Sequence, residues 1–264
     1  MPKRRLDALL AERGLYESRT RAAAAVLAGD VRLGGDGRRA AKPGQMVADD
    51  VTVEVAEPPP FVSRGGQKLA NALDLLGLDP AGRRCLDLGA STGGFTDCLL
   101  KRGAEAVAVV DVSYGELHWS LRQDPRVTVI ERTNARSLTP EQLPFRADLI
   151  VADLSFISLG KVLPAAIECA APAFDLLALV KPQFELGRDR VGKGGVVRSA
   201  EDRREALLSV GTLAGETMGL SVLGYASSGL PGPAGNRESF VWIAERGREG
   251  AVEDLEAAAR RAEP

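Results

Sequence analysis

The chain has 264 residues, a net charge of −2 and a hydrophobic fraction of 45%, as expected for a globular protein with one large domain and room for a small one. Three cysteines and one histidine argue against a disulfide framework, serine-triad chemistry and a bound metal, and they favour a reduced, cytoplasmic setting. No apolar run reaches the roughly 18 residues that span a bilayer, and no signal-peptide pattern is present, so we expect no membrane partner.

The first 57 residues predict a small α+β domain. Apolar spacing predicts a helix over 5–13, and Ser18 is a suitable N-cap for a second helix over 19–28. The segments VRLGG (31–35) and VTVEV (51–55) read as short strands. The first 42 residues hold ten lysines and arginines against five acids, a local excess of +5. This excess indicates either a nucleic-acid surface or an ordinary solvated face.

The stretch RLDALLAERGLYESRTRAAAAVLAGDVRLGG (5–35) resembles the S-four-type RNA-binding domain, named after a small-subunit ribosomal protein. The resemblance implies that two short helices and a turn form a basic face for structured RNA. Contacts to phosphates at such a face would supply affinity and registration rather than sequence choice. The arginines that we expect to face RNA are Arg5, Arg19, Arg21, Arg32 and, from the next domain, Arg64.

A proline run separates this domain from the rest of the chain. Glu57-Pro58-Pro59-Pro60 favours a stiff, extended segment, and we place the linker at residues 58–63. From residue 64 to 264, strand patterns alternate with helix patterns, which predicts an α/β fold with a mostly parallel sheet and helices on both faces. The expected strands are 85–90, 106–112, 127–131, 147–154, 174–182, 221–228 and 238–245, and the expected helices are 95–103, 115–123, 159–170, 200–219 and 249–260.

The segment CLDLGASTGGFTD (85–97) reads as a strand, a glycine-rich turn and the start of a helix, the arrangement that lets a backbone approach a nucleotide cofactor. It contains neither G-x-G-x-x-G nor a Walker motif. Asp87 precedes the glycines and Asp111 ends the next strand, and together they favour S-adenosylmethionine as the cofactor. The alternative role for Asp111 is to cap a helix. The alternative role for Asn134 is that of a turn residue. The expected cofactor residues are Asp87, Gly89, Ala90, Ser91, Thr92, Gly93, Gly94, Phe95, Asp111, Val112, Asn134, Ala135 and Asp153.

Four charged residues stand where such a sheet presents side chains to a substrate: Lys68, Asp153, Lys181 and Glu238. A ribose hydroxyl is a poor nucleophile, and a lysine can act as its base only if burial or a second cation lowers the lysine pKa. Lys181 follows the apolar run DLLALV, Lys68 would be the second cation, and the two carboxylates would orient the ammonium groups. Two solvated salt bridges are the alternative explanation.

Six motifs resemble the TlyA (hemolysin A-like) family, in which an S-four domain precedes an FtsJ-like 2′-O-methyltransferase domain. They are VSRGGQKL (62–69), LDLGASTGGFTD (86–97), VDVSYGEL (110–117), DLSFISL (153–159), LVKPQFE (179–185) and GNRESF (235–240). The resemblance implies a Rossmann-like class I methyltransferase with a mostly parallel seven-stranded sheet. It also implies a catalytic tetrad of Lys68, Asp153, Lys181 and Glu238, with Lys181 as the base.

The family further implies methylation of a cytidine ribose in ribosomal RNA, of the large subunit and in some members also the small one. The expected partners are therefore ribosomal RNA or assembled ribosomal subunits, and we expect a monomer. The segment 182–199, with Arg188, Arg190, Lys193 and Arg198, is predicted to be a mobile loop over the active site that contacts RNA; a plain surface loop is the alternative. Three alternatives stay open: a pore-forming hemolysin, a non-catalytic RNA-binding factor in ribosome assembly, and methylation of another RNA such as transfer or messenger RNA.

Overall fold

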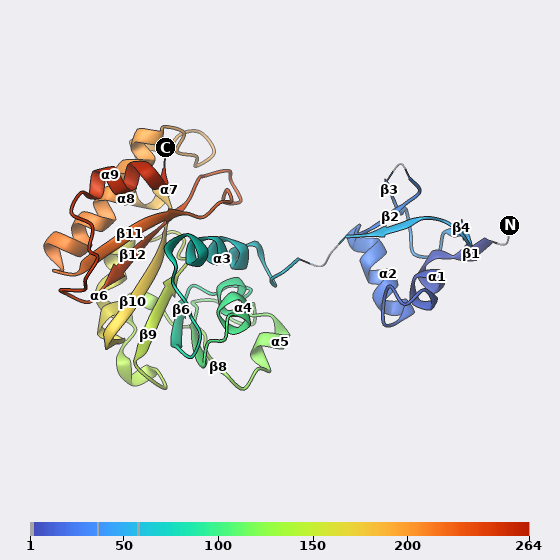
Figure 1. Ribbon diagram of the computed structural model, residues 1–264, viewed down its shortest axis with the longest axis horizontal. Helices are drawn as coiled ribbons and strands as arrows, with labels where there is room; N and C mark the ends of the chain where they lie inside the picture. Colours follow the sequence, from blue (N-terminus) through green and yellow to red (C-terminus); the bar gives the residue numbers. More distant parts are fainter. Residues whose placement is uncertain (1–2, 36, 57–58, 264) are drawn as a thin grey trace. The chain divides into compact units, whose positions relative to one another are not determined.

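The computed structural model describes residues 3–35, 37–56 and 59–263, in two compact units, Met1–Pro59 and Pro60–Pro264. Figure 1 shows the elements of each unit. Residue 58 of the predicted linker and residue 57 before it lie outside the described residues. No helix in the described ranges is long and apolar enough to cross a membrane.

The first unit packs two helices against short strands. Ser18 begins the second helix as predicted, because its side chain accepts a hydrogen bond from the Arg21 amide at 3.2 Å. Leu6, Leu10 and Val26 lie in the core between the helices and the strands. The elements are β1 (Lys3–Arg5), α1 (Leu6–Glu12), α2 (Arg19–Ala28), β2 (Val31–Leu33), β3 (Arg38–Arg39), β4 (Met46–Ala48) and β5 (Val53–Val55), with β1 paired to β4 and a second sheet in the order β3-β2-β5.

The second unit is built on a seven-stranded sheet in the order β11-β12-β10-β9-β6-β7-β8. All neighbours are parallel except at β12, which runs antiparallel to both β10 and β11. This topology confirms the predicted α/β fold with a mostly parallel seven-stranded sheet. The strands are β6 (Arg84–Leu88), β7 (Ala106–Val110), β8 (Val127–Ile130), β9 (Ala147–Ala152), β10 (Ala170–Val180), β11 (Ser221–Ser227) and β12 (Ser239–Ala244).

Helices cover both faces of this sheet (Figure 1). Side chains alternate along a buried strand, so Leu149 and Val151 of β9 pack on one face and Ile150 on the other. The first face is covered by α3 (Arg64–Leu76), α4 (Gly94–Lys101) and α5 (Trp119–Arg122), and the second by α6 (Leu163–Glu168), α8 (Ala200–Thr212) and α9 (Leu255–Ala262). The remaining helical turns are α7 (Pro182–Glu185), four 3₁₀ turns (Ala135–Ser137, Pro140–Gln142, Leu159–Lys161 and Arg188–Arg190) and a π turn (Leu213–Thr217).

Several helices differ from their predicted bounds. The helix predicted over 115–123 begins only at Trp119, because Gly115 has φ of +79° and His118, the N-cap, has ψ of 136°, both outside the helical region. The segment 159–170 divides into a 3₁₀ turn and α6, and the C-terminal helix starts at Leu255 after the N-cap Asp254 rather than at residue 249. The helix α3, which carries Lys68, was not predicted: its two glycines lowered the helical signal of the sequence.

Candidate active site

The candidate site lies along the edge of the large sheet that is formed by the carboxyl ends of its parallel strands. Gly89, Asp111, Asp153 and Lys181 each directly follow the last residue of a parallel strand, namely β6, β7, β9 and β10. Glu238 directly precedes β12, whose first residue pairs with the last residue of β10. Because β12 is antiparallel, its start lies at the same edge as the carboxyl ends of the other strands. The topology therefore gathers these five residues although they are far apart in the sequence.

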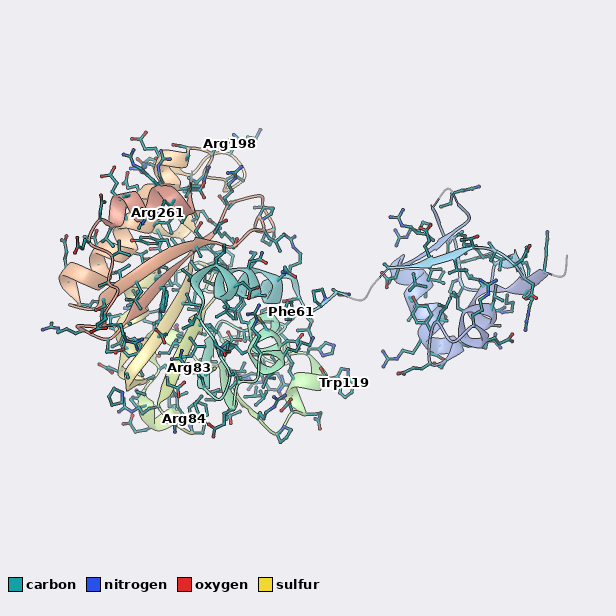
Figure 2. The ribbon with its side chains drawn as sticks, viewed as in Figure 1. Phe61, Arg83, Arg84, Trp119, Arg198 and Arg261 are labelled. Carbon is teal, nitrogen blue, oxygen red and sulfur yellow. The ribbon has the colours of Figure 1, made fainter. Side chains whose placement is uncertain are left out.

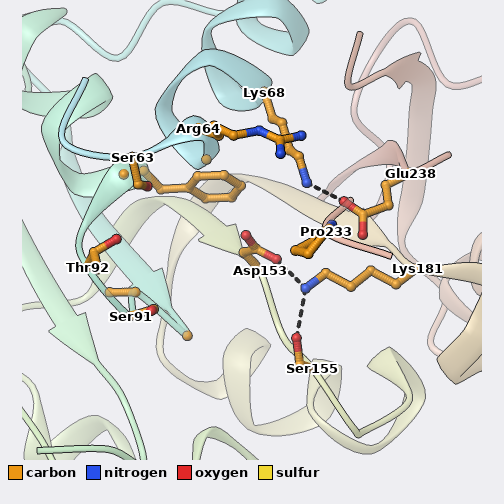
Figure 3. Close-up of a pocket in the computed structure, with 15 residues that line it drawn as sticks. Ser63, Arg64, Lys68, Ser91, Thr92, Asp153, Ser155, Lys181, Pro233 and Glu238 are labelled. Atoms are coloured by element: carbon orange, nitrogen blue, oxygen red, sulfur yellow. Dashed lines mark hydrogen bonds and ion pairs between the residues drawn. The ribbon is translucent and has the colours of Figure 1, made fainter. Parts of the chain in front are cut away.

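Two lysine–carboxylate pairs face a cavity of about 500 Å³ at this edge (Figure 3). Lys68 Nζ lies 2.5 Å from Glu238 Oε2, and Lys181 Nζ lies 2.7 Å from Asp153 Oδ1. Lys181 Nζ also donates a hydrogen bond to Ser155 Oγ at 2.9 Å. The side chains of Lys68 and Glu238 are only 7% and 2% exposed, and that of Lys181 is 11% exposed. The Lys68–Glu238 pair is thus shielded from water, unlike an ordinary surface salt bridge, whereas the Lys181–Asp153 pair is partly open to the cavity, with the Asp153 side chain 25% exposed.

Close helix packing places Lys68. A Cβ atom added to Gly66 of α3 would lie 2.4 Å from the Phe61 side chain and 2.8 Å from the Gly94 carbonyl oxygen at the start of α4. Only glycine therefore allows the two helix starts to approach this closely. Two residues further along, the Lys68 side chain reaches the Glu238 carboxylate from the α3 side of the sheet.

A second cavity of about 530 Å³ continues from the first. The two cavities share Gly89, Ser91, Asp153 and Ser155 in their walls and so form one cleft. Gly89 has φ of +83°, and a Cβ atom there would lie 2.6 Å from the Asp153 carbonyl oxygen, so the loop needs glycine at this point. The predicted cofactor residues that line the cleft are Gly89, Ala90, Ser91, Thr92, Gly94, Phe95, Asp111, Val112, Asn134, Ala135 and Asp153.

Asp111 is held as a hydrogen-bond acceptor in this cleft. Its carboxylate accepts hydrogen bonds from the Ser91 amide at 2.8 Å, the Ser113 amide at 2.8 Å and Ser113 Oγ at 2.6 Å. Burial acts to raise the pKa of Asp111, but these hydrogen bonds outweigh it and leave the pKa below its usual value. Asn134 lines the cleft, and its Oδ1 accepts a hydrogen bond from the Arg136 amide at 3.0 Å.

Two predicted cofactor residues, Asp87 and Gly93, line neither cavity. Gly93 is the N-cap of α4, with φ of +94°, and it packs against the side chains of Leu117 and Leu121. Asp87 is fully buried beneath the loop, where its Oδ2 accepts a hydrogen bond from Thr96 Oγ1 at 2.6 Å. Asp87 Oδ1 has no hydrogen-bond partner within the described ranges. Burial raises the pKa of Asp87 to about 7.

This pKa predicts a pH-dependent stability. The folded protein keeps the Asp87 proton up to about pH 7, whereas the unfolded chain loses it near the usual value of 3.8, so the free energy of unfolding falls as pH rises between these values. The slope from this one group is up to about 1.4 kcal/mol per pH unit. Replacing Asp87 with Asn removes that contribution. Urea unfolding of both proteins from pH 4 to pH 8 should show a flatter pH profile for the variant; parallel profiles would contradict the assignment.

The arginines predicted to face RNA fall into two groups. Arg5, Arg19, Arg21 and Arg32 are exposed on the first unit, and Arg5 and Arg19 lie 2.7 and 3.5 Å from Asp7 Oδ2. Arg64 lines the cavity of the two lysine–carboxylate pairs in the second unit, where it donates a hydrogen bond to the Pro231 carbonyl oxygen at 2.5 Å. No group of three or more metal-ligating side chains occurs among residues 3–35, 37–56 and 59–263.

Two residues that sequence reasoning missed organise the loop after Asp153. Ser155 contacts Lys181 directly, and Glu185 accepts hydrogen bonds from Ser158 Oγ at 2.7 Å and from the Leu159 amide at 2.8 Å. Burial raises the pKa of Glu185. Glu185 thereby ties the loop that carries Asp153 to the short helix that follows Lys181. In the sequence, Ser155 is marked only by its position two residues after Asp153, the aspartate at the end of a predicted strand.

The segment 182–199 is attached beside Glu238. The buried Asn236 side chain accepts a hydrogen bond from the Val197 amide and donates one to the Gly195 carbonyl oxygen, both at 2.8 Å. Arg190, Lys193 and Arg198 line neither cavity. These side chains therefore do not support the prediction that the segment lies over the active site.

Replacing Asn236 with Ala should loosen this segment, because both backbone bonds are lost. Each net hydrogen bond contributes about 1 kcal/mol, so the opened population should rise about tenfold or more. Trypsin cleavage after Arg190, Lys193 and Arg198 measures the opening. Asn71→Ala, which removes one bond to the Ser228 carbonyl oxygen at the other end of the β11–β12 loop, is the matched control. Equal cleavage rates in the two variants would show that Asn236 does not hold the segment.

The sheet topology and the cleft at its edge define the second unit as a class I methyltransferase fold. The chain belongs to the FtsJ-like methyltransferase family, whose model matches residues 61–245, and within it to the TlyA (hemolysin A-like) proteins. A Mycobacterium tuberculosis protein named 16S/23S rRNA (cytidine-2′-O)-methyltransferase TlyA is 53% identical, over 90% of this chain and 89% of its own length. Hemolysin A of Brachyspira hyodysenteriae is 39% identical, over 78% and 85%. A solved structure of a candidate hemolysin from Streptococcus thermophilus superposes with a TM-score of 0.73 and 36% identity, covering 99% of this chain and 96% of that one.

Proposed function

We propose that this protein transfers the methyl group of S-adenosylmethionine to the 2′-hydroxyl of a cytidine ribose in ribosomal RNA. The observation that carries the proposal is the convergence of two lysine–carboxylate pairs on one cavity, which joins the predicted cofactor cleft at Asp153. The name of the Mycobacterium tuberculosis relative supports the choice of ribosomal RNA and of cytidine.

The cleft fits S-adenosylmethionine. Asp111 would accept hydrogen bonds from the two ribose hydroxyls, Asn134 and Ala135 would contact the adenine edge, and the glycine-rich loop from Gly89 to Phe95 would hold the methionine part. When bound, the cofactor supplies an electrophilic methyl group on a sulfonium. Asp153, which lines both cavities, marks the point where that methyl group would meet the RNA hydroxyl.

Lys181 is the proposed base. Lys181 Nζ would accept the proton of the 2′-hydroxyl group, and Asp153 and Ser155, at 2.7 and 2.9 Å, fix the position of Nζ. The Lys68–Glu238 pair forms the other wall of the cavity and orients the ribose. Positioning and electrostatics in this cavity then supply most of the acceleration.

The first unit is proposed to dock the RNA. In this proposal residues 1–57 are an S-four-type domain, 58–63 a linker and 64–264 the methyltransferase domain. The exposed Arg5, Arg19, Arg21 and Arg32 would contact phosphates of ribosomal RNA or of an assembled subunit.

The test is methyl transfer from labelled S-adenosylmethionine to naked ribosomal RNA and to each purified ribosomal subunit, followed by nucleoside analysis. We expect label in 2′-O-methylcytidine. Calorimetry of the cofactor on the same preparation separates the alternatives. Cofactor binding without transfer to any ribosomal substrate would contradict the substrate, and no cofactor binding would favour a non-catalytic RNA-binding assembly factor.

Because one relative carries the name hemolysin A, lysis of erythrocytes by the purified protein is the second assay. Lysis that is unaffected by Lys181→Ala would favour a membrane-active function over methyl transfer. Absence of lysis beside active methyl transfer is the expected result.

A further inference from the structure

A third cavity, of about 630 Å³, adjoins the site on the far side of Glu238. Its wall is formed by the loop between β11 and β12 and by the end of α9, from which Arg261 projects (Figure 2). Glu238 lines this cavity as well as the cavity of the two lysine–carboxylate pairs. The two cavities therefore lie within one side chain of each other, close enough for neighbouring groups of one polymer to occupy both.

The charges of the third cavity are unbalanced. Its two carboxylates already have buried partners: Glu238 Oε2 lies 2.5 Å from Lys68 Nζ, and Glu263 Oε1 lies 2.7 Å from Arg203 Nη2. Arg237 is 67% exposed, and it lies 3.9 Å from the Glu263 oxygen that Arg203 already holds.

Arg261 is exposed and has no ion pair within the ranges that the structure describes. Once the two buried pairs are counted as neutral, two guanidinium groups remain in the wall of the cavity. A cavity wall in which two guanidinium groups exceed the available carboxylates favours an anion. The planar fork of a guanidinium matches the oxygens of a phosphate group with two parallel hydrogen bonds.

We propose that this cavity is a subsite for a phosphodiester group of the RNA strand that carries the methylated ribose, held by Arg237 and Arg261. The subsite rests on the proposed function and deepens it. An RNA strand carries one phosphate per nucleotide, so the chain that leaves the target ribose past Glu238 brings a phosphate into the adjoining space. The arginines grip the backbone and not a base, so the subsite adds affinity and registration without sequence choice.

The test compares two double variants of equal charge. Arg237→Ala/Arg261→Ala removes the subsite, and Arg246→Ala/Arg260→Ala is the control. Arg260 neighbours Arg261 on α9 but pairs with Glu256 at 2.6 Å, and Arg246 donates a hydrogen bond to the Gly219 carbonyl oxygen at 3.1 Å; neither lines any of the three cavities.

The subsite variant should raise KM for ribosomal RNA about tenfold relative to the control, with kcat and cofactor binding unchanged. The slope of log Kd for RNA against log salt concentration should fall by about 0.7, the value for one lost phosphate contact on a single strand. Arg237→Lys/Arg261→Lys, which keeps both charges, should restore the salt slope and part of the affinity.

Equal KM values and equal salt slopes in the subsite and control variants, with an active wild type, would overturn the subsite alone. A wild type that transfers no methyl group to any ribosomal RNA would overturn the proposed function and the subsite with it.

Discussion

Replacing Lys181 with Met should lower kcat for methyl transfer by about 10³-fold, within the range of about 10² to 10⁴ for a general base, and leave cofactor binding nearly unchanged. Methionine keeps the unbranched stem but cannot take a proton. Lys181 Nζ lies 2.7 Å from Asp153 Oδ1 and 2.9 Å from Ser155 Oγ, so its position is already set before the ribose hydroxyl arrives. The loss should therefore appear in kcat rather than in KM for RNA.

Single-turnover transfer with saturating RNA and labelled cofactor measures this effect, and calorimetry measures cofactor affinity in the same variant. Lys181→Arg separates charge from proton transfer, because a guanidinium stays protonated and should be nearly as inactive as Met. Lys161→Met, on an exposed 3₁₀ turn, is the control for loss of a lysine. Substantial activity in Lys181→Arg would rule out proton acceptance and leave Lys181 a purely electrostatic role.

Replacing Glu238 with Leu should destabilise the second unit by about 3–5 kcal/mol, because it leaves the buried Lys68 ammonium without a partner. The double variant Lys68→Met/Glu238→Leu should recover most of that loss, since well-packed apolar side chains can replace a buried ion pair at little cost. Both variants should be inactive, so the double variant should regain stability without regaining activity. A double variant as unstable as the single one would contradict this account of the pair.

Urea unfolding followed by tryptophan fluorescence measures this effect. Trp119 and Trp242 are the chain's two tryptophans, and both belong to the second unit, so the signal reports that unit without the first. Asp74→Asn is the control, because it breaks the Arg102–Asp74 pair, in which the Asp74 side chain is 67% exposed. Loss of such a surface pair should cost less than about 1 kcal/mol.

The sequence by itself determined the sheet and the strand-end residues. Apolar runs that end in a polar residue place Asp111, Asp153 and Lys181 at the carboxyl ends of parallel strands, and such ends share one edge of the sheet. The glycine-rich loop that begins at Gly89 was also recognisable from the sequence. Several glycines directly after a strand mark a turn where the backbone approaches another group closely.

Only the tertiary structure decided which of these residues meet. Lys68 and Glu238 are 170 positions apart, and they pair because β12 runs antiparallel and α3 approaches α4 through two glycines. Asp87 looked like a cofactor contact, yet its position inside β6 turns its side chain beneath the loop. Burial, strand direction and contacts across the chain depend on how distant segments pack, and a local sequence pattern holds no information about them.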